Sequence, residues 1–61
     1  MKAKEIIKQL EADGWRIVRQ KGSHVQLKKE GMMELITIPE HGNKEVSIGV
    51  YNKIRKIAGW K

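Results

Sequence analysis

The sequence predicts an α+β domain with the element order α-β-β-β-α, in which two helices pack on one face of a three-stranded antiparallel sheet. Apolar residues recur with helical spacing near both ends of the chain, and three short segments typical of strands lie between them. A three-stranded meander has one face to cover, and two helices of about three turns suffice to cover it. The other face stays open, and residues 1–61 form a single domain.

Residues 2–13 are predicted to form the first helix. Its apolar stripe follows the spacing i, i+3, i+4, i+7 and consists of Ala3, Ile6, Ile7 and Leu10. Gly14 follows Asp13 and suits the left-handed position that ends a helix.

Residues 15–19 are β-branched or aromatic and too short for a helix, so we expect a strand with Trp15 and Ile17 on one side. The stretch Lys21-Gly22-Ser23 supplies turn residues. Residues 24–29 then alternate, with one apolar set (Val25, Leu27) and one polar set (His24, Gln26, Lys28). A period of two with the sets separated predicts a half-buried strand whose polar side faces outward.

Residues 29–32 are typical of a hairpin turn, and residues 33–38 are predicted to form the third strand. Leu35 and Ile36 fall on opposite faces of it, so one of them must be exposed or lie under another element. Pro39 lacks an N–H for the ladder and is expected to close this strand, and residues 39–45 form a polar loop.

Ser47 is expected to cap a second helix, which Gly59 ends. Its apolar stripe consists of Val50, Tyr51, Ile54, Ile57 and Ala58. The aromatic residues Trp15 and Tyr51 fall on predicted apolar faces, which favours packing over base stacking. Trp60 is compatible with either role.

The chain carries 13 basic and 7 acidic residues, a formal charge of +6. This charge favours a polyanionic partner, nucleic acid before an acidic protein or a membrane surface, although a solvated lysine-rich surface explains it equally well. No cysteine is present, so disulfides and thiolate metal sites are excluded. The first residues contain no apolar run of the length of a signal peptide or membrane span, and we expect a cytoplasmic protein.

His24 is the residue best suited to proton transfer, because a histidine takes up and releases protons near neutral pH. Cleavage of RNA needs such a group at the ribose 2′-hydroxyl or the leaving 5′-oxygen, and positive charge at the phosphorane. Lys21 and Lys28 lie close enough in sequence to supply that charge. Gly22 allows close approach of the backbone to a phosphate, and Ser23 offers a hydrogen bond. Spacing alone nevertheless favours a solvated surface histidine after a turn.

His41 is a second candidate, since it precedes a helix N-terminus where a phosphate is stabilised, but a role in shaping its loop is favoured. Metal catalysis is not expected, because the spacing of Glu34, Glu40 and Glu45 does not form a ligand set. Ser23 and His24 are neighbours on a strand and point in opposite directions, which argues against a serine hydrolase.

The whole chain resembles the HicA (YcfA-like) toxins. The resemblance lies in Gly14-Trp15 after the first helix, in Arg19-Gln20-Lys21-Gly22-Ser23-His24, in the loop from Ile38 to Glu45 and in the end of the last helix, Ile54-Arg55-Lys56-Ile57-Ala58-Gly59. Two stretches depart from the family pattern. Residues 25–28 lack the aromatic or second histidine often found there, and residues 46–50 lack the usual Pro/Gly-Thr opening.

The resemblance implies a fold like that of double-stranded-RNA-binding domains and the toxin role in a type II toxin–antitoxin module. It implies cleavage of messenger RNA without a metal or other cofactor, with His24 as the essential histidine. It also implies a HicB-type antitoxin as the protein partner and no membrane partner. A non-catalytic RNA-binding module of the same fold is the alternative, since double-stranded RNA is bound largely by shape.

Overall fold

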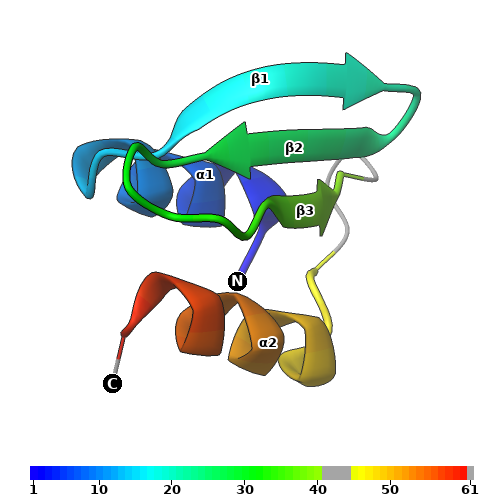
Figure 1. Cartoon of the computed structure of the whole chain (residues 1–61). Helices are drawn as coiled ribbons and strands as arrows, with labels where there is room; N and C mark the ends of the chain where they lie inside the picture. Colours follow the sequence, from blue (N-terminus) through cyan, green and yellow to red (C-terminus); the bar gives the residue numbers. More distant parts are fainter. Residues whose placement is uncertain (41–44, 61) are drawn as a thin grey trace.

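The computed structural model describes residues 1–40 and 45–60, and its elements follow the predicted order α-β-β-β-α (Figure 1). They are α1 (Ala3–Ala12), β1 (Arg16–Lys21), β2 (His24–Lys28), β3 (Ile36–Pro39) and α2 (Ile48–Ala58). The strands form one antiparallel sheet in the order β1-β2-β3, so β2 is central. Neither described helix is long and apolar enough to cross a membrane.

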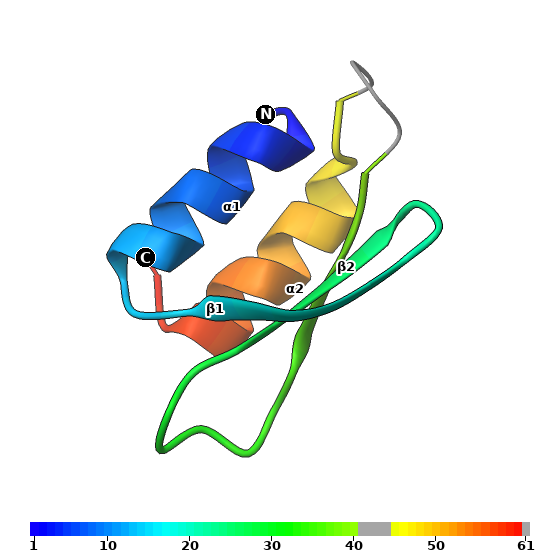
Figure 2. The same ribbon diagram turned by 90° about the horizontal axis from the view of Figure 1, so that it is seen from above.

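Both helices lie on the same side of the sheet, as the view from above shows (Figure 2). The residues that fill the space between helices and sheet are all apolar; they are Ala3, Ile6, Ile7, Leu10, Trp15, Val25, Leu27, Ile36, Ile38, Val46 and Ile54. The predicted inward set of β2 and the predicted stripe of α1 are therefore confirmed. Neither described helix covers the opposite face of the sheet, so this face is open within the described residues.

The predicted helix ends are present. The Ser47 hydroxyl accepts a hydrogen bond from the backbone N–H of Val50 at 3.3 Å, which caps α2 at its N-terminus. Gly14 and Gly59, which follow α1 and α2, have φ angles of 98° and 78°. The stripe of α2 is also confirmed, with Ile54 buried and its other members partly buried against the core.

The third strand differs from its predicted range of 33–38. It begins at Ile36, opposite Leu27, because the chain between the turn at Met32 and Ile36 lies outside the ladder with β2. Met33 is fully exposed in this segment, and Leu35 is more exposed than the buried Ile36. Pro39 belongs to the strand as its last residue, opposite His24. An edge strand tolerates a residue without an N–H, and β3 is such a strand.

The first strand is shifted relative to its predicted range of 15–19. Trp15 is buried but precedes the strand, and β1 extends to Lys21. Ile17 lies opposite Leu27 on the helix side, yet 45% of its surface is exposed because β1 is an edge strand. The register with β2 also shifts between Ile17 and Arg19, which is a β-bulge at Val18.

The start of α2 is held beside the start of α1. The Met1 carbonyl accepts a hydrogen bond from the N–H of Val46 at 2.8 Å, and Lys2 pairs with Glu45 in an isolated bridge. The Glu45 carboxylate lies 2.7 Å from the amino group of Met1, and this hydrogen bond lowers the pKa of Glu45. These contacts tie the segment that precedes α2 to the residues that precede α1.

Ile17 and Leu27 lie opposite each other in the sheet, and truncating each in turn tests which of them belongs to the hydrophobic core. We expect Leu27→Ala to lower the free energy of unfolding by about 2–5 kcal/mol, because it leaves a cavity under the central strand. The total free energy of unfolding of a domain of this size is on the order of 3–5 kcal/mol, so Leu27→Ala should be largely unfolded. Ile17→Ala should cost about 1 kcal/mol or less, since its side chain is half exposed. Urea unfolding followed by tryptophan fluorescence measures the loss for Ile17→Ala, and the same signal without urea shows how much of Leu27→Ala is folded; equal losses would contradict this assignment of the core.

Candidate functional site

A two-residue turn, Gly22-Ser23, connects β1 to β2 and lies between the paired residues Lys21 and His24. Gly22 has a φ of 55°, and no non-glycine residue of the described chain has a positive φ. A positive φ at the first turn residue alone is the pattern of a type II′ hairpin turn, which favours glycine there. The backbone carbonyl of Ser23 accepts a hydrogen bond from the N–H of Glu40, and this bond ties the turn to the end of β3.

His24 is the first residue of β2, and its side chain is exposed on the open face of the sheet. The next residue, Val25, is buried on the helix side, so the alternation predicted for this strand is confirmed. Lys21 flanks His24 on β1, and Pro39 flanks it on β3. The imidazole therefore stands on a scaffold that is fixed on three sides by backbone pairing and the turn.

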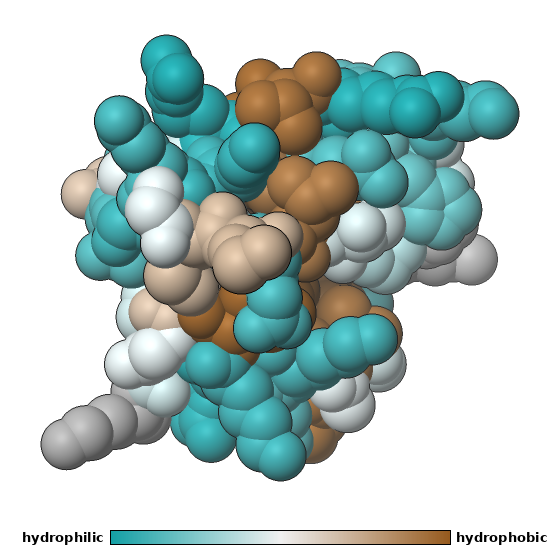
Figure 3. Space-filling view, in the orientation of Figure 1, coloured by the Kyte–Doolittle hydropathy of each residue, from teal (hydrophilic) through white to brown (hydrophobic). Residues whose placement is uncertain are grey.

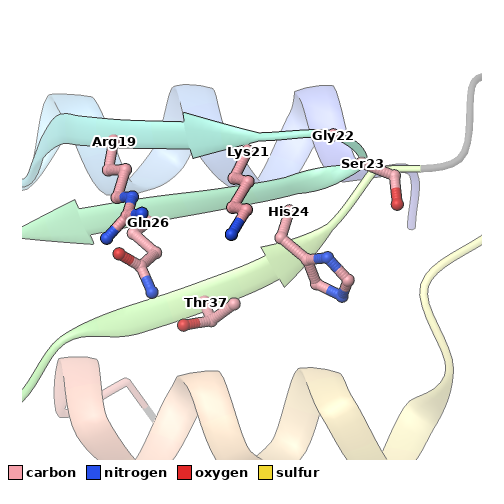
Figure 4. A pocket seen from close by; sticks show the side chains of 7 residues that line it. All are labelled: Arg19, Lys21, Gly22, Ser23, His24, Gln26 and Thr37. Carbon is pink, nitrogen blue, oxygen red and sulfur yellow. The ribbon is translucent and has the colours of Figure 1, made fainter.

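The side chains around His24 form a depression of about 570 Å³ on this open face. Its lining residues are Arg19, Lys21, Gly22, Ser23, His24, Gln26 and Thr37. Figure 4 shows that the side chains of Arg19, Lys21, Gln26, His24 and Thr37 project to the same side of the sheet. The lining combines two cations, an imidazole and several neutral hydrogen-bonding groups, and contains no carboxylate. Such a set of groups suits a phosphate and a proton transfer beside it.

A family model described as the HicA toxin of bacterial toxin–antitoxin systems matches residues 3–60. This chain belongs to the HicA toxin family. A chain in a solved structure of the HicA3 and HicB3 toxin–antitoxin complex is 42% identical in sequence, with a TM-score of 0.82. The similarity covers 100% of the present chain and 97% of that one. No curated protein matches the sequence significantly.

Four of the residues predicted for a HicA-type site lie together around the depression: Lys21, Gly22, Ser23 and His24. Lys28 is on the same face but at the other end of β2, opposite Arg16. With a separation of four residues at about 3.3 Å each, Lys28 lies roughly 13 Å along the strand from His24. His41 lies outside the described residues.

Sequence reasoning did not name Arg19, Gln26 or Thr37 as site residues, although all three line the depression. Strict alternation from Trp15 puts Arg19 on the helix side, but the bulge at Val18 inserts one residue and turns Arg19 outward, opposite Gln26. Thr37 is the register partner of Gln26 on β3. The sequence did indicate the outward direction of Thr37, because it is the one polar residue between two isoleucines in a strand.

No group of three or more histidine, cysteine, aspartate or glutamate side chains in residues 1–40 and 45–60 is placed to hold a metal ion. The described residues that line the depression supply one imidazole, two cations and neutral hydrogen-bonding groups.

We expect Gly22 to be required because of its positive φ, and not because a larger side chain would clash with its surroundings. A Cβ at Gly22 would meet no atom within 4 Å, but its positive φ is strained for any other residue. We expect Gly22→Ala to cost about 1–2 kcal/mol of unfolding free energy. Gly49→Ala is the matched control, because Gly49 lies in α2 with equally open surroundings and an ordinary φ, and it should gain up to about 1 kcal/mol. Urea unfolding measures both; a neutral Gly22→Ala would argue against the type II′ turn.

Proposed function

We propose that this chain is the toxin of a type II toxin–antitoxin system and cleaves messenger RNA in the cytoplasm, without a metal ion, through His24. The observation that supports this most directly is the exposed imidazole at the edge of a depression lined by Arg19 and Lys21. Membership of the HicA toxin family points to the same role. The RNA phosphate would sit in the depression, contacted by Lys21 and by the turn residues Gly22 and Ser23. His41 is a further candidate for contact with the RNA.

The proposed reaction is transesterification within the RNA strand. The ribose 2′-oxygen bonds to the phosphorus, and the bond from the phosphorus to the 5′-oxygen breaks, which leaves a 2′,3′-cyclic phosphate and a 5′-hydroxyl. His24 takes the proton from the attacking 2′-hydroxyl or gives one to the leaving 5′-oxygen. The charges of Lys21 and Arg19 stabilise the phosphorane, whose negative charge exceeds that of the starting phosphodiester.

The protein partner in this proposal is a HicB-type antitoxin that binds over the depression and excludes RNA. Its support is the solved complex of the related HicA3 with HicB3. The basic, exposed face around His24 is complementary to an acidic surface, so the antitoxin and the RNA would compete for the same groups. Coexpression of a HicB-type protein should then relieve growth arrest by this chain.

Replacement of His24 tests the catalytic role. We expect His24→Ala and His24→Gln to lower the rate of RNA cleavage by about 100-fold to 10,000-fold, the usual contribution of a positioned acid or base. Both variants should fold normally, since the side chain is exposed and outside the core. The measurement is cleavage of end-labelled RNA in EDTA, with analysis of the fragment ends for 2′,3′-cyclic phosphate.

Lys8→Ala is the control, because Lys8 is an exposed cation on α1, away from the open face. It should cleave RNA at close to the wild-type rate and arrest growth. Cleavage by His24→Ala at the wild-type rate would overturn the catalytic assignment. Salt-sensitive binding of RNA without fragments from the wild type would instead identify a non-catalytic RNA-binding module.

A further inference from the structure

The basic side chains of the open face extend well beyond the depression around His24. Three register pairs of the β1–β2 hairpin face outward: Lys21 with His24, Arg19 with Gln26, and Arg16 with Lys28. Each pair contributes at least one cation, so the positive charge forms a strip along the whole hairpin. Figure 3 shows hydrophilic side chains over the region of β1 and β2, with hydrophobic ones between them.

The bulge at Val18 creates this strip. Arg16 and Arg19 are three residues apart, and in a regular strand they would point to opposite faces. The extra residue of the bulge shifts the in–out alternation of β1 by one position. Both arginines therefore lie on the open face with Lys21 and Lys28. A bulge that re-aims side chains in this way concentrates like charges, which is unfavourable for the isolated fold. An anionic ligand would offset that repulsion.

The far end of the strip has a surface of its own. Arg16, Val18, Lys28 and Glu30 line a second depression there, separate from the one at His24. Arg16 and Lys28 are exposed, and the ion pairs of the described residues, Met1 with Glu45 and Lys29 with Asp13, use neither cation. Val18 is 54% exposed and offers an apolar surface beside the two charges.

We propose that Arg16 and Lys28 form a second phosphate-binding subsite, occupied by the same RNA strand that is cleaved at His24. The strip follows one hairpin and is two strands wide, which suits one extended strand with a single row of phosphates better than a duplex. The distance of roughly 13 Å between His24 and Lys28 exceeds one nucleotide step, so the subsite holds a phosphate more than one nucleotide from the cleaved bond. Val18 offers its exposed apolar side chain to a base or ribose at this subsite.

The test consists of a cleavage assay and a binding assay with short and long RNA. Only the cleavage assay rests on the proposed function. Arg16→Gln/Lys28→Gln should leave kcat/KM for a dinucleotide unchanged, because a dinucleotide reaches only the depression at His24. For a strand of about ten nucleotides, we expect kcat/KM to fall about tenfold. Equal effects on both substrates, or none on either, would overturn the subsite.

The binding assay does not need catalysis. In a His24→Ala background, fluorescence anisotropy with the longer strand should show weaker binding by Arg16→Gln/Lys28→Gln. The slope of log affinity against log salt should become shallower by roughly 0.7, the value for the one phosphate of a single strand that the protein no longer neutralises. Lys4→Gln/Lys8→Gln is the control, since it removes the same charge from α1 and should change the slope much less. Glu30→Gln should strengthen binding, because it removes the one acidic group of the second depression.

Identical slopes for the two double variants would show that only total charge matters and would overturn the subsite. If the His24→Ala protein without further changes did not bind the longer strand, the subsite would also be overturned. Weaker binding of a HicB-type antitoxin with unchanged RNA affinity would assign the surface to the protein partner instead. The expected salt slopes could also be found while RNA cleavage does not depend on His24. That result would support the subsite and contradict the proposed nuclease function.

Discussion

The structure depends on the burial of the helix-facing side of a single three-stranded sheet. In a chain of 61 residues, two helices cover that side only, and the apolar side chains of β2 and β3 pack beneath them. The central strand therefore has two functions at once. Val25 and Leu27 pack under the helices, and His24, Gln26 and Lys28 point to the open face because successive side chains of a strand alternate.

This arrangement gives His24 a rigid support without burying it. Its strand is paired on both sides, and the turn before it is fixed by Gly22 and by the hydrogen bond between Ser23 and Glu40. The proton transfer proposed for His24 needs such a scaffold, because the imidazole is held in place and stays accessible to a polymer. The site lies on a surface and not in a deep cleft, which suits a long substrate that cannot enter a closed cavity.

The edge strand β1 contributes charge and little to the core. All its residues are exposed, and the bulge at Val18 places Arg16, Arg19 and Lys21 on one face. Charged side chains and a bulge also discourage another strand from pairing with a free sheet edge. The same features thus protect the isolated chain from edge-to-edge association and supply the cations that the proposed RNA strand requires.

Composition and periodicity determined much of this protein by themselves. The helical spacing of α1 and α2, the alternation of residues 24–28 and the glycines and Ser47 at the element ends predicted the fold, the core and the exposure of His24, because these features depend on local geometry and burial. Only the tertiary structure decided which residues beyond its sequence neighbours Lys21, Gly22 and Ser23 surround His24. Arg19 joins it through a bulge, Thr37 through the register of β3, and Lys28 stands apart from it, because register and bulges depend on how whole strands pair and not on the pattern within one strand.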